Sequence, residues 1–250
     1  MIRVVNRQLI LVSFCFLLSA IACGQNISSA DNLEQLLITQ NVFTLQELDS
    51  LAVQMQETLP DSLGKASFNL PPEARIANYV KATTWLASRD ASACIIFGKK
   101  IAGYLLHNKQ QKDLGVVLRN IGGAYYLMGD YPSALKYYQY AGGIFNKIND
   151  KTEGAALNIT LGQFYSKQGG CNMAKDYFIA ARNQFILNKD AGGLAMANNF
   201  LGNYFEDGLS NLDSALYYYQ QTLNIYKHQK KKDKIALSYS YDFISGILAK

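Results

Sequence analysis

A repeat with a fixed period runs through the centre of this 250-residue chain and constrains its fold more than any other feature. Five positions of one unit recur in the next: Gly122, Tyr125, Ala134, Tyr138 and Ala141 return as Gly162, Tyr165, Ala174, Phe178 and Ala181. Every offset between the two sets is 40. A period in this range is typical of repeat arrays, in which each unit buries its apolar face only by stacking on its neighbours. The sequence therefore predicts an array of similar units.

Each unit is predicted to be two helices joined by a tight turn. The recurring residues are spaced by 3, 9, 4 and 3, and residues three or four apart share one face of a helix. The gap of nine holds Leu-Met-Gly-Asp-Tyr-Pro in one unit and Lys-Gln-Gly-Gly-Cys in the next, which are signals that end one helix and begin another. Because Gly inside a helix costs roughly 0.5–1 kcal/mol relative to Ala, its return at Gly122, Gly162 and Gly202 indicates close approach of the paired helix.

This pattern resembles the tetratricopeptide repeat, whose helix A carries a small residue and an aromatic, and whose helix B carries Ala, an aromatic and Ala. The spacing Gly-x2-Tyr-x8-Ala-x3-aromatic-x2-Ala is met in two consecutive units. The period of 40 is longer than the usual one of about 34. The resemblance implies an all-α fold, a right-handed α-solenoid of antiparallel helix pairs. Longer variants of this kind occur in bacterial signalling proteins of the family.

Residues 1–22 are predicted to be a signal peptide. Arg3 and Arg7 give a basic start, and the uncharged, mostly apolar run 9–22 follows. This run is shorter than the roughly 20 residues that span a bilayer, and it suits the apolar core of a leader. The alternative is a first buried helix, against which the charges and the polar switch at Gln25 argue.

Two processing sites follow the apolar run. The stretch Ala-Ile-Ala-Cys that ends at Cys23 resembles a bacterial lipoprotein box, with Ala where Leu is commoner. The overlapping stretch Ala22-Cys23-Gly24, followed by Gln25, also fits ordinary cleavage at a small-x-small site. We expect lipidation of Cys23, because a cysteine at this point has no other explanation. Diacyl attachment would hold the protein firmly at a membrane without a spanning helix, whereas ordinary cleavage would release it as a secreted protein.

Residues 23–72 are predicted to form a helical cap and a loop. Two short helices are expected between Asp31 and Leu59, and the second opens with a capping box of Thr44 and Glu47. A loop bracketed by prolines follows. Terminal units of solenoids are usually atypical, so this part is expected to cap the array.

The array itself is predicted over residues 73–250. It divides into a degenerate repeat 73–109, units 113–150, 151–190 and 191–232, and a final capping helix or half repeat 233–250. In the degenerate repeat, Ala82 takes the Gly place and Cys94 the small place of helix B. In unit 191–232, a turn insertion between Glu206 and Asp213 shifts helix B by one place.

The sequence predicts no enzymatic activity, no metal site, no cofactor and no nucleic-acid partner. Its two histidines, His107 and His228, have no second ligand at helical spacing, and phosphate loops, nucleophile elbows and zinc spacings are absent from the sequence. Removing Arg3 and Arg7 from the 24 basic residues leaves 22, against 19 acidic residues, and this net charge is too mild to favour nucleic acid.

The resemblance implies that side chains of helix A line a concave groove. The candidates, by repeat position, are Arg119, Asn120, Tyr126, Gln163, Ser166, Lys167, Asn199, Asn203 and Glu206. This set is polar and mixed in sign, which suits a peptide or protein segment held by side-chain hydrogen bonds. Relatives that clamp a C-terminal carboxylate use basic and Asn residues in successive repeats. The next unit here has Ile159 and Thr160 instead, so we do not expect that activity.

The favoured function is a non-enzymatic protein–protein interaction scaffold, exported and lipid-anchored, that binds a peptide or protein segment in this groove. Its expected location is the periplasm or the outer membrane. The alternative is the sensor or input component of a bacterial signalling or transcription-regulatory system. Relatives with the longer repeat often continue into a membrane helix and a histidine kinase or DNA-binding module, so this chain would act through a separate kinase or DNA-binding partner.

Overall fold

The computed structural model describes residues 43–55, 58–60, 62–229 and 234–249. The predicted leader, the lipidation candidate Cys23 and the first predicted cap helix lie outside the described residues. Secondary structure within the described ranges is entirely helical. The fold is all-α, as the sequence predicts.

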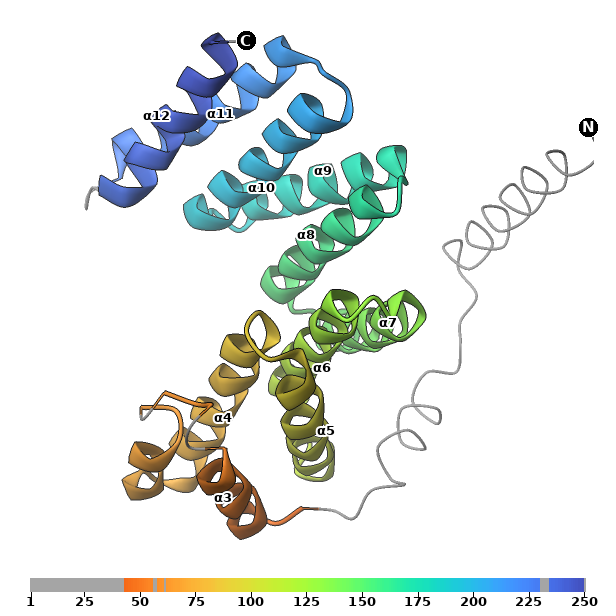
Figure 1. Cartoon of the computed structure of the whole chain (residues 1–250), viewed down its shortest axis with the longest axis vertical. Helices are drawn as coiled ribbons and strands as arrows, with labels where there is room; N and C mark the ends of the chain where they lie inside the picture. Colours follow the sequence, from red (N-terminus) through yellow and green to blue (C-terminus); the bar gives the residue numbers. More distant parts are fainter. Residues whose placement is uncertain (1–42, 56–57, 61, 230–233, 250) are drawn as a thin grey trace, which may run out of the picture. The chain divides into compact units, whose positions relative to one another are not determined.

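The helices follow one another in chain order as antiparallel pairs (Figure 1). The first helices of successive pairs are α4 (Pro72–Ala87), α6 (Gln111–Leu127), α8 (Lys151–Lys167) and α10 (Ala191–Asn203). Their partners are α5 (Ala91–His107), α7 (Tyr131–Lys147), α9 (Cys171–Leu187) and α11 (Leu212–His228), and α12 (Lys234–Leu248) packs on α11. Each first helix also contacts the first helix of the next pair, from α4 to α10. This is an α-solenoid of helix pairs, and the predicted fold class is confirmed.

The helices begin at intervals half as long as the predicted repeat period of 40. From α5 to α10 the helices begin at residues 91, 111, 131, 151, 171 and 191, at equal intervals. The helices α5 to α9 all have 17 residues. In the units α6–α7 and α8–α9 the two helices are therefore equal in length, although their core faces carry different residues.

The turns between these helices share one geometry. The residue after each C-cap adopts positive φ, and the residues in this position are Lys109, Gly129, Asn149, Gly169 and Lys189. The next backbone N–H bonds back to a carbonyl five residues earlier, as Gly170 N does to Tyr165 O at 2.8 Å. This Schellman closure satisfies carbonyls that the helix end would leave unpaired. Asp130, Asp150 and Asp190 then cap the next helix by accepting a backbone N–H, and Asp90 caps α5 in the same way after a turn of different geometry.

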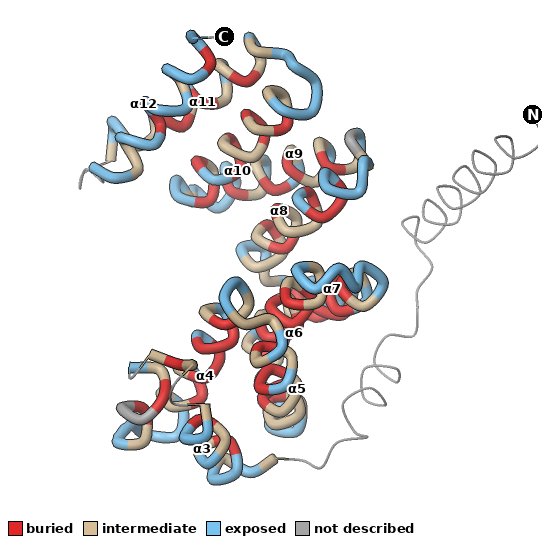
Figure 2. Tube along the Cα trace, in the orientation of Figure 1, coloured by how far each residue is buried: buried red, intermediate tan, exposed pale blue. Residues whose placement is uncertain are grey.

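The repeating glycines lie where the two helices of a pair approach closely. A Cβ atom built on Gly162 would lie 2.4 Å from the ring of Phe178, and one on Gly122 would lie 2.6 Å from the ring of Tyr138. Both rings are 2% exposed. The close approach expected from the sequence is thus confirmed, and buried residues occur along every helix from α4 to α11 (Figure 2).

The N-terminal helix α3 (Leu45–Gln54) begins with the predicted capping box. Thr44 N donates to Glu47 Oε2 at 2.7 Å, and Glu47 N donates to Thr44 Oγ1 at 3.3 Å. The predicted loop after it contains a 3₁₀ turn, Lys65–Asn69. The Tyr79 hydroxyl donates to Asp49 at 2.6 Å and so ties α3 to α4.

The predicted turn insertion appears at the end of α10. The helix passes into a π-helical turn, Tyr204–Gly208, instead of ending as α6 and α8 do. The residue with positive φ is then Ser210, and Asn211 caps α11. Both are one place later than the regular helix spacing would put them, which accounts for the shift of helix B.

Candidate functional site

A pocket of about 550 Å³ lies between the first helices α6, α8 and α10. The second helices α7 and α9 close its floor, since they supply Tyr138 and Phe178. The π turn after α10 completes its lining with Tyr204, Asp207 and Gly208. Three consecutive helix pairs therefore build one site.

Aromatic rings form the floor and walls of this pocket, which we call the aromatic pocket. Its aromatic residues are Tyr126, Tyr138, Phe164, Phe178, Phe200 and Tyr204. The Tyr138 and Phe164 rings meet edge to face with centroids 6.1 Å apart, while Phe178 and Phe200 stack at 5.5 Å. Such contacts fix the ring orientations beyond what apolar burial alone does. Burial raises the pKa of Tyr126 and of Tyr138 above the ordinary tyrosine value.

Polar side chains surround the aromatic floor. Gln163, Ser166, Lys167 and Asp207 are exposed residues of the lining. The side chains of Gln163, Lys167 and Asp207 make no hydrogen bond or ion pair with any residue that the structure describes. An apolar pocket with a few unengaged polar groups at its edge is the usual form of a ligand site.

Five of the nine predicted groove residues line this pocket. They are Tyr126, Gln163, Ser166, Lys167 and Asn203. They come from three successive first helices, at the places that the repeat pattern indicated. Whether they bind a partner stays a prediction.

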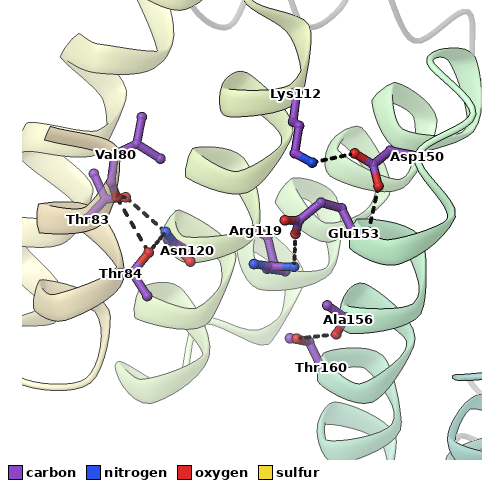
Figure 3. A network of polar contacts seen from close by, with 10 residues as sticks. All are labelled: Val80, Thr83, Thr84, Lys112, Arg119, Asn120, Asp150, Glu153, Ala156 and Thr160. Atoms are coloured by element: carbon purple, nitrogen blue, oxygen red, sulfur yellow. Dashed lines mark hydrogen bonds and ion pairs between the residues drawn. The ribbon is translucent and has the colours of Figure 1, made fainter. Parts of the chain in front are cut away.

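Arg119 and Asn120 are engaged in contacts within the protein (Figure 3). Arg119 Nη1 donates to Glu153 Oε2 at 2.8 Å and joins α6 to α8. Asn120 is 8% exposed, and its Nδ2 donates to Oγ1 of Thr83 and of Thr84, each at 2.9 Å. These contacts join α6 to α4. The geometry therefore gives both residues a structural role between neighbouring units.

The remaining candidates lie near the pocket without lining it. The Tyr219 hydroxyl lies within hydrogen-bond distance of two acceptors, Glu206 Oε2 at 2.8 Å and Oδ1 of the pocket residue Asn203 at 2.6 Å, and its single proton is shared between them. Asn199 Oδ1 is buried and has no hydrogen-bond partner among the described residues. Glu206 and Asn203 together hold α11 against the π turn.

Of the six aromatic residues that line the pocket, only Tyr126 was predicted from the sequence as a groove residue. Tyr138 and Phe178 were recognised only as repeat residues of the core. Phe164 and Tyr204 were not singled out, although they stand one repeat period apart, at a place that is Ala124 in the preceding unit. An aromatic that occupies one repeat position in later units only is a signal that could have identified this wall.

Metal-binding groups and membrane spans are absent from the described part of the chain. No group of three or more His, Cys, Asp or Glu residues there is arranged to hold a metal ion. Within the same residues, no helix has both the length and the apolar character needed to cross a membrane.

Comparisons with known proteins agree with the architecture. BtubC (BKLC) from P. vanneervenii superposes with a TM-score of 0.60 at 15% identity, covering 83% of this chain and 84% of that one. A putative kinesin light chain from Podosopora anserina, with nearly identical TPR-like repeats, gives a TM-score of 0.55 at 9% identity, covering 70% of this chain and 86% of that one. The chain has a tetratricopeptide-type fold. At these identities the likeness concerns the fold alone.

Sequence comparisons add no closer relationship. No family model matches the chain, and no curated protein matches it. The function of this tetratricopeptide-type protein therefore has to follow from its own site. An aromatic pocket with polar side chains at its edge is suited to binding.

Proposed function

We propose that this protein is an exported, lipid-anchored interaction scaffold that binds a peptide or protein segment along its first helices, over the aromatic pocket. One observation carries the proposal: three successive first helices place five predicted groove residues around a single pocket of about 550 Å³. The tetratricopeptide-type fold supports it, because such repeats commonly present extended binding surfaces.

Photo-crosslinking in the native host tests the binding face. A photoreactive amino acid replaces Gln163 on the pocket edge, and in a matched variant it replaces Asn183, an exposed residue at the corresponding place of α9. A partner should be captured from position 163 and not from position 183. Equal capture from both positions, or capture from 183 alone, would contradict the groove. A captured histidine kinase or DNA-binding regulator would place the protein in a signalling system.

The anchor has a separate test. Mass spectrometry of the mature N-terminus should find a diacylated Cys23, and Cys23→Ala should move the protein from the membrane fraction to the soluble fraction. An unmodified N-terminus would indicate ordinary signal cleavage. The crosslinking result is independent of this outcome.

A further inference from the structure

The aromatic rings at the floor of the aromatic pocket are buried, whereas those at its walls are partly exposed. Tyr138 and Phe178 are 2% exposed, and Phe164 and Tyr204 are 5% exposed. Tyr126 and Phe200, which are half-buried, form the walls. A bulky apolar side chain entering between these walls would meet rings on several sides, which is the contact that aromatic and long aliphatic groups favour.

The π turn gives this pocket a feature that the other units lack. The helices α6 and α8 remain α-helical to Leu127 and Lys167, whereas the corresponding stretch after α10 is the π turn Tyr204–Gly208. Tyr204, Asp207 and Gly208 of this turn all line the pocket. Single π turns are uncommon and are frequent at functional sites. Here the turn supplies a buried aromatic ring, Tyr204, and an exposed carboxylate, Asp207, to the same pocket.

The polar edge carries one positive and one negative group. Lys167 ends α8, and Asp207 lies in the π turn. Both line the pocket and are exposed, and neither forms an ion pair with a described residue. Charges of opposite sign at a binding edge favour a ligand of complementary polarity and set its direction.

Apolar surface continues outside the pocket. Tyr131, which is 40% exposed, packs against the pocket residues Tyr126 and Phe164 at centroid distances of 5.9 and 6.1 Å. The adjacent turn presents Leu127 and Met128, exposed by 59% and 56%. A free small molecule in the pocket would leave this surface uncovered, whereas a longer chain would cover it.

We propose that the aromatic pocket is a specificity subsite that takes one bulky apolar side chain of a bound peptide segment, with an acidic neighbour facing Lys167 and a basic neighbour facing Asp207. This assignment rests on the proposed groove function and names what the groove selects. The segment extends from the pocket across the apolar turn that follows α6.

Selection from a random peptide library displayed on phage tests the assignment, with the purified protein as bait. Thr160→Phe fills the pocket from inside, because Thr160 lines it and its hydroxyl bonds only to Ala156 of its own helix. Ala180→Phe adds the same ring at an exposed place on α9 and is the matched control. Lys167→Glu combined with Asp207→Lys reverses the charges of the edge.

The unmodified protein should enrich peptides that share one aromatic or long aliphatic residue between residues of opposite charge. A synthetic peptide of that sequence should bind Thr160→Phe about tenfold to hundredfold more weakly, and Ala180→Phe with unchanged affinity. The charge-reversed variant should enrich peptides with the two charges exchanged. Circular dichroism should be the same for all variants.

Other outcomes would overturn the assignment in distinguishable ways. Enriched peptides that lack a common apolar residue and bind Thr160→Phe normally would remove the subsite and leave the groove function standing. Binding of N-acetyl-phenylalanine amide to a protein that enriches no peptide would make the pocket a small-molecule site. No enrichment together with no crosslink from position 163 would overturn both proposals.

Discussion

The two halves of the array join their first helices by different means. Between α4 and α6, Asn120 bridges to the hydroxyls of Thr83 and Thr84. Between α8 and α10, two units later, Gln163 stands at the place of Thr83. Phe200 stands there at the place of Asn120, and both of these residues line the open pocket. The same backbone pattern thus supports a closed polar junction in one half and an open aromatic pocket in the other.

The middle junction, between α6 and α8, contains polar pairs, which Figure 3 shows, and also part of the aromatic pocket. Near the start of α8, Lys112 Nζ lies 2.9 Å from Asp150 Oδ2, and its hydrogen bond to Asp150 raises the pKa of Lys112. Farther along the same helix, Thr160 faces the pocket. The first part of α8 therefore pairs with polar residues of α6, and the later part of α8 lines the aromatic pocket. Side-chain identity therefore decides which junctions between first helices are closed by polar pairs and which leave room for the pocket, and the π turn adds its own residues to that pocket.

The largest expected loss of stability concerns the half of the array that contains the aromatic pocket. Gly162→Val should lower the free energy of unfolding by about 2–3 kcal/mol, because its side chain would collide with the Phe178 ring. Displaced Phe178 would also narrow the pocket. The control is Gly154→Val on the same helix, where an added Cβ meets nothing within 4 Å. Urea unfolding measures both variants, and equal stabilities would contradict the close packing.

The next largest loss of stability is expected at the polar junction between α4 and α6. Asn120→Ala should cost about 2 kcal/mol, because it removes a buried hydrogen bond to Thr83 and a partly buried one to Thr84. Thr160→Ala at the equivalent place of the next unit should cost less, since that hydroxyl bonds only within its helix. Peptide binding should survive Asn120→Ala. Thermal unfolding that ranks the two variants in the opposite order would remove the distinction between the halves.

A smaller effect is expected at the middle junction. Asp150→Ala removes the cap of α8 and the pairing with Lys112, and should cost about 1 kcal/mol near pH 7. Burial acts to raise the pKa of Asp150, but its hydrogen bonds from the Glu153 N–H and Lys112 lower that pKa overall. The stability difference should therefore be complete above the unfolded-state pKa of about 3.9 and disappear as the pH falls through the folded-state value. Unfolding curves of both proteins from pH 7 to pH 3 provide the measurement.

The smallest change in stability is expected at the turns between helices, and it should be equal in the two halves of the array. Lys109→Gly and Lys189→Gly should each stabilise the protein by roughly 0.5 kcal/mol, because both lysines have positive φ, which glycine adopts without a Cβ clash. Lys147→Gly, within helix α7, should instead destabilise it. Calorimetry that gave a gain at only one of the two turns would show that the turns are not equivalent.

Sequence spacing was sufficient to predict the helix pairs, the close approach at Gly162 and the insertion before α11. These are local features: helix faces repeat every three to four residues, and a helix end needs a residue that tolerates positive φ. The equal spacing of the helix starts, at half the predicted period of 40, was not predicted. Only the turn residues repeat at this shorter interval, because the core residues of the two helices in a unit differ. Candidates for the groove were predicted by repeat position, and five of them do line one pocket.

The sequence by itself determined the array, since a small residue such as Gly162 opposite an aromatic such as Phe178 admits one close pairing of helices. The tertiary structure alone decided which polar side chains are engaged. Arg119 and Lys167 look alike in the sequence as groove cations, yet of the two only Arg119 has an acid across the junction among the described residues, Glu153. The physical reason is that an ion pair needs an acidic residue on the neighbouring helix within reach of the cation. Which residue lies within reach is set by the packing of two repeats and is not encoded in either repeat alone.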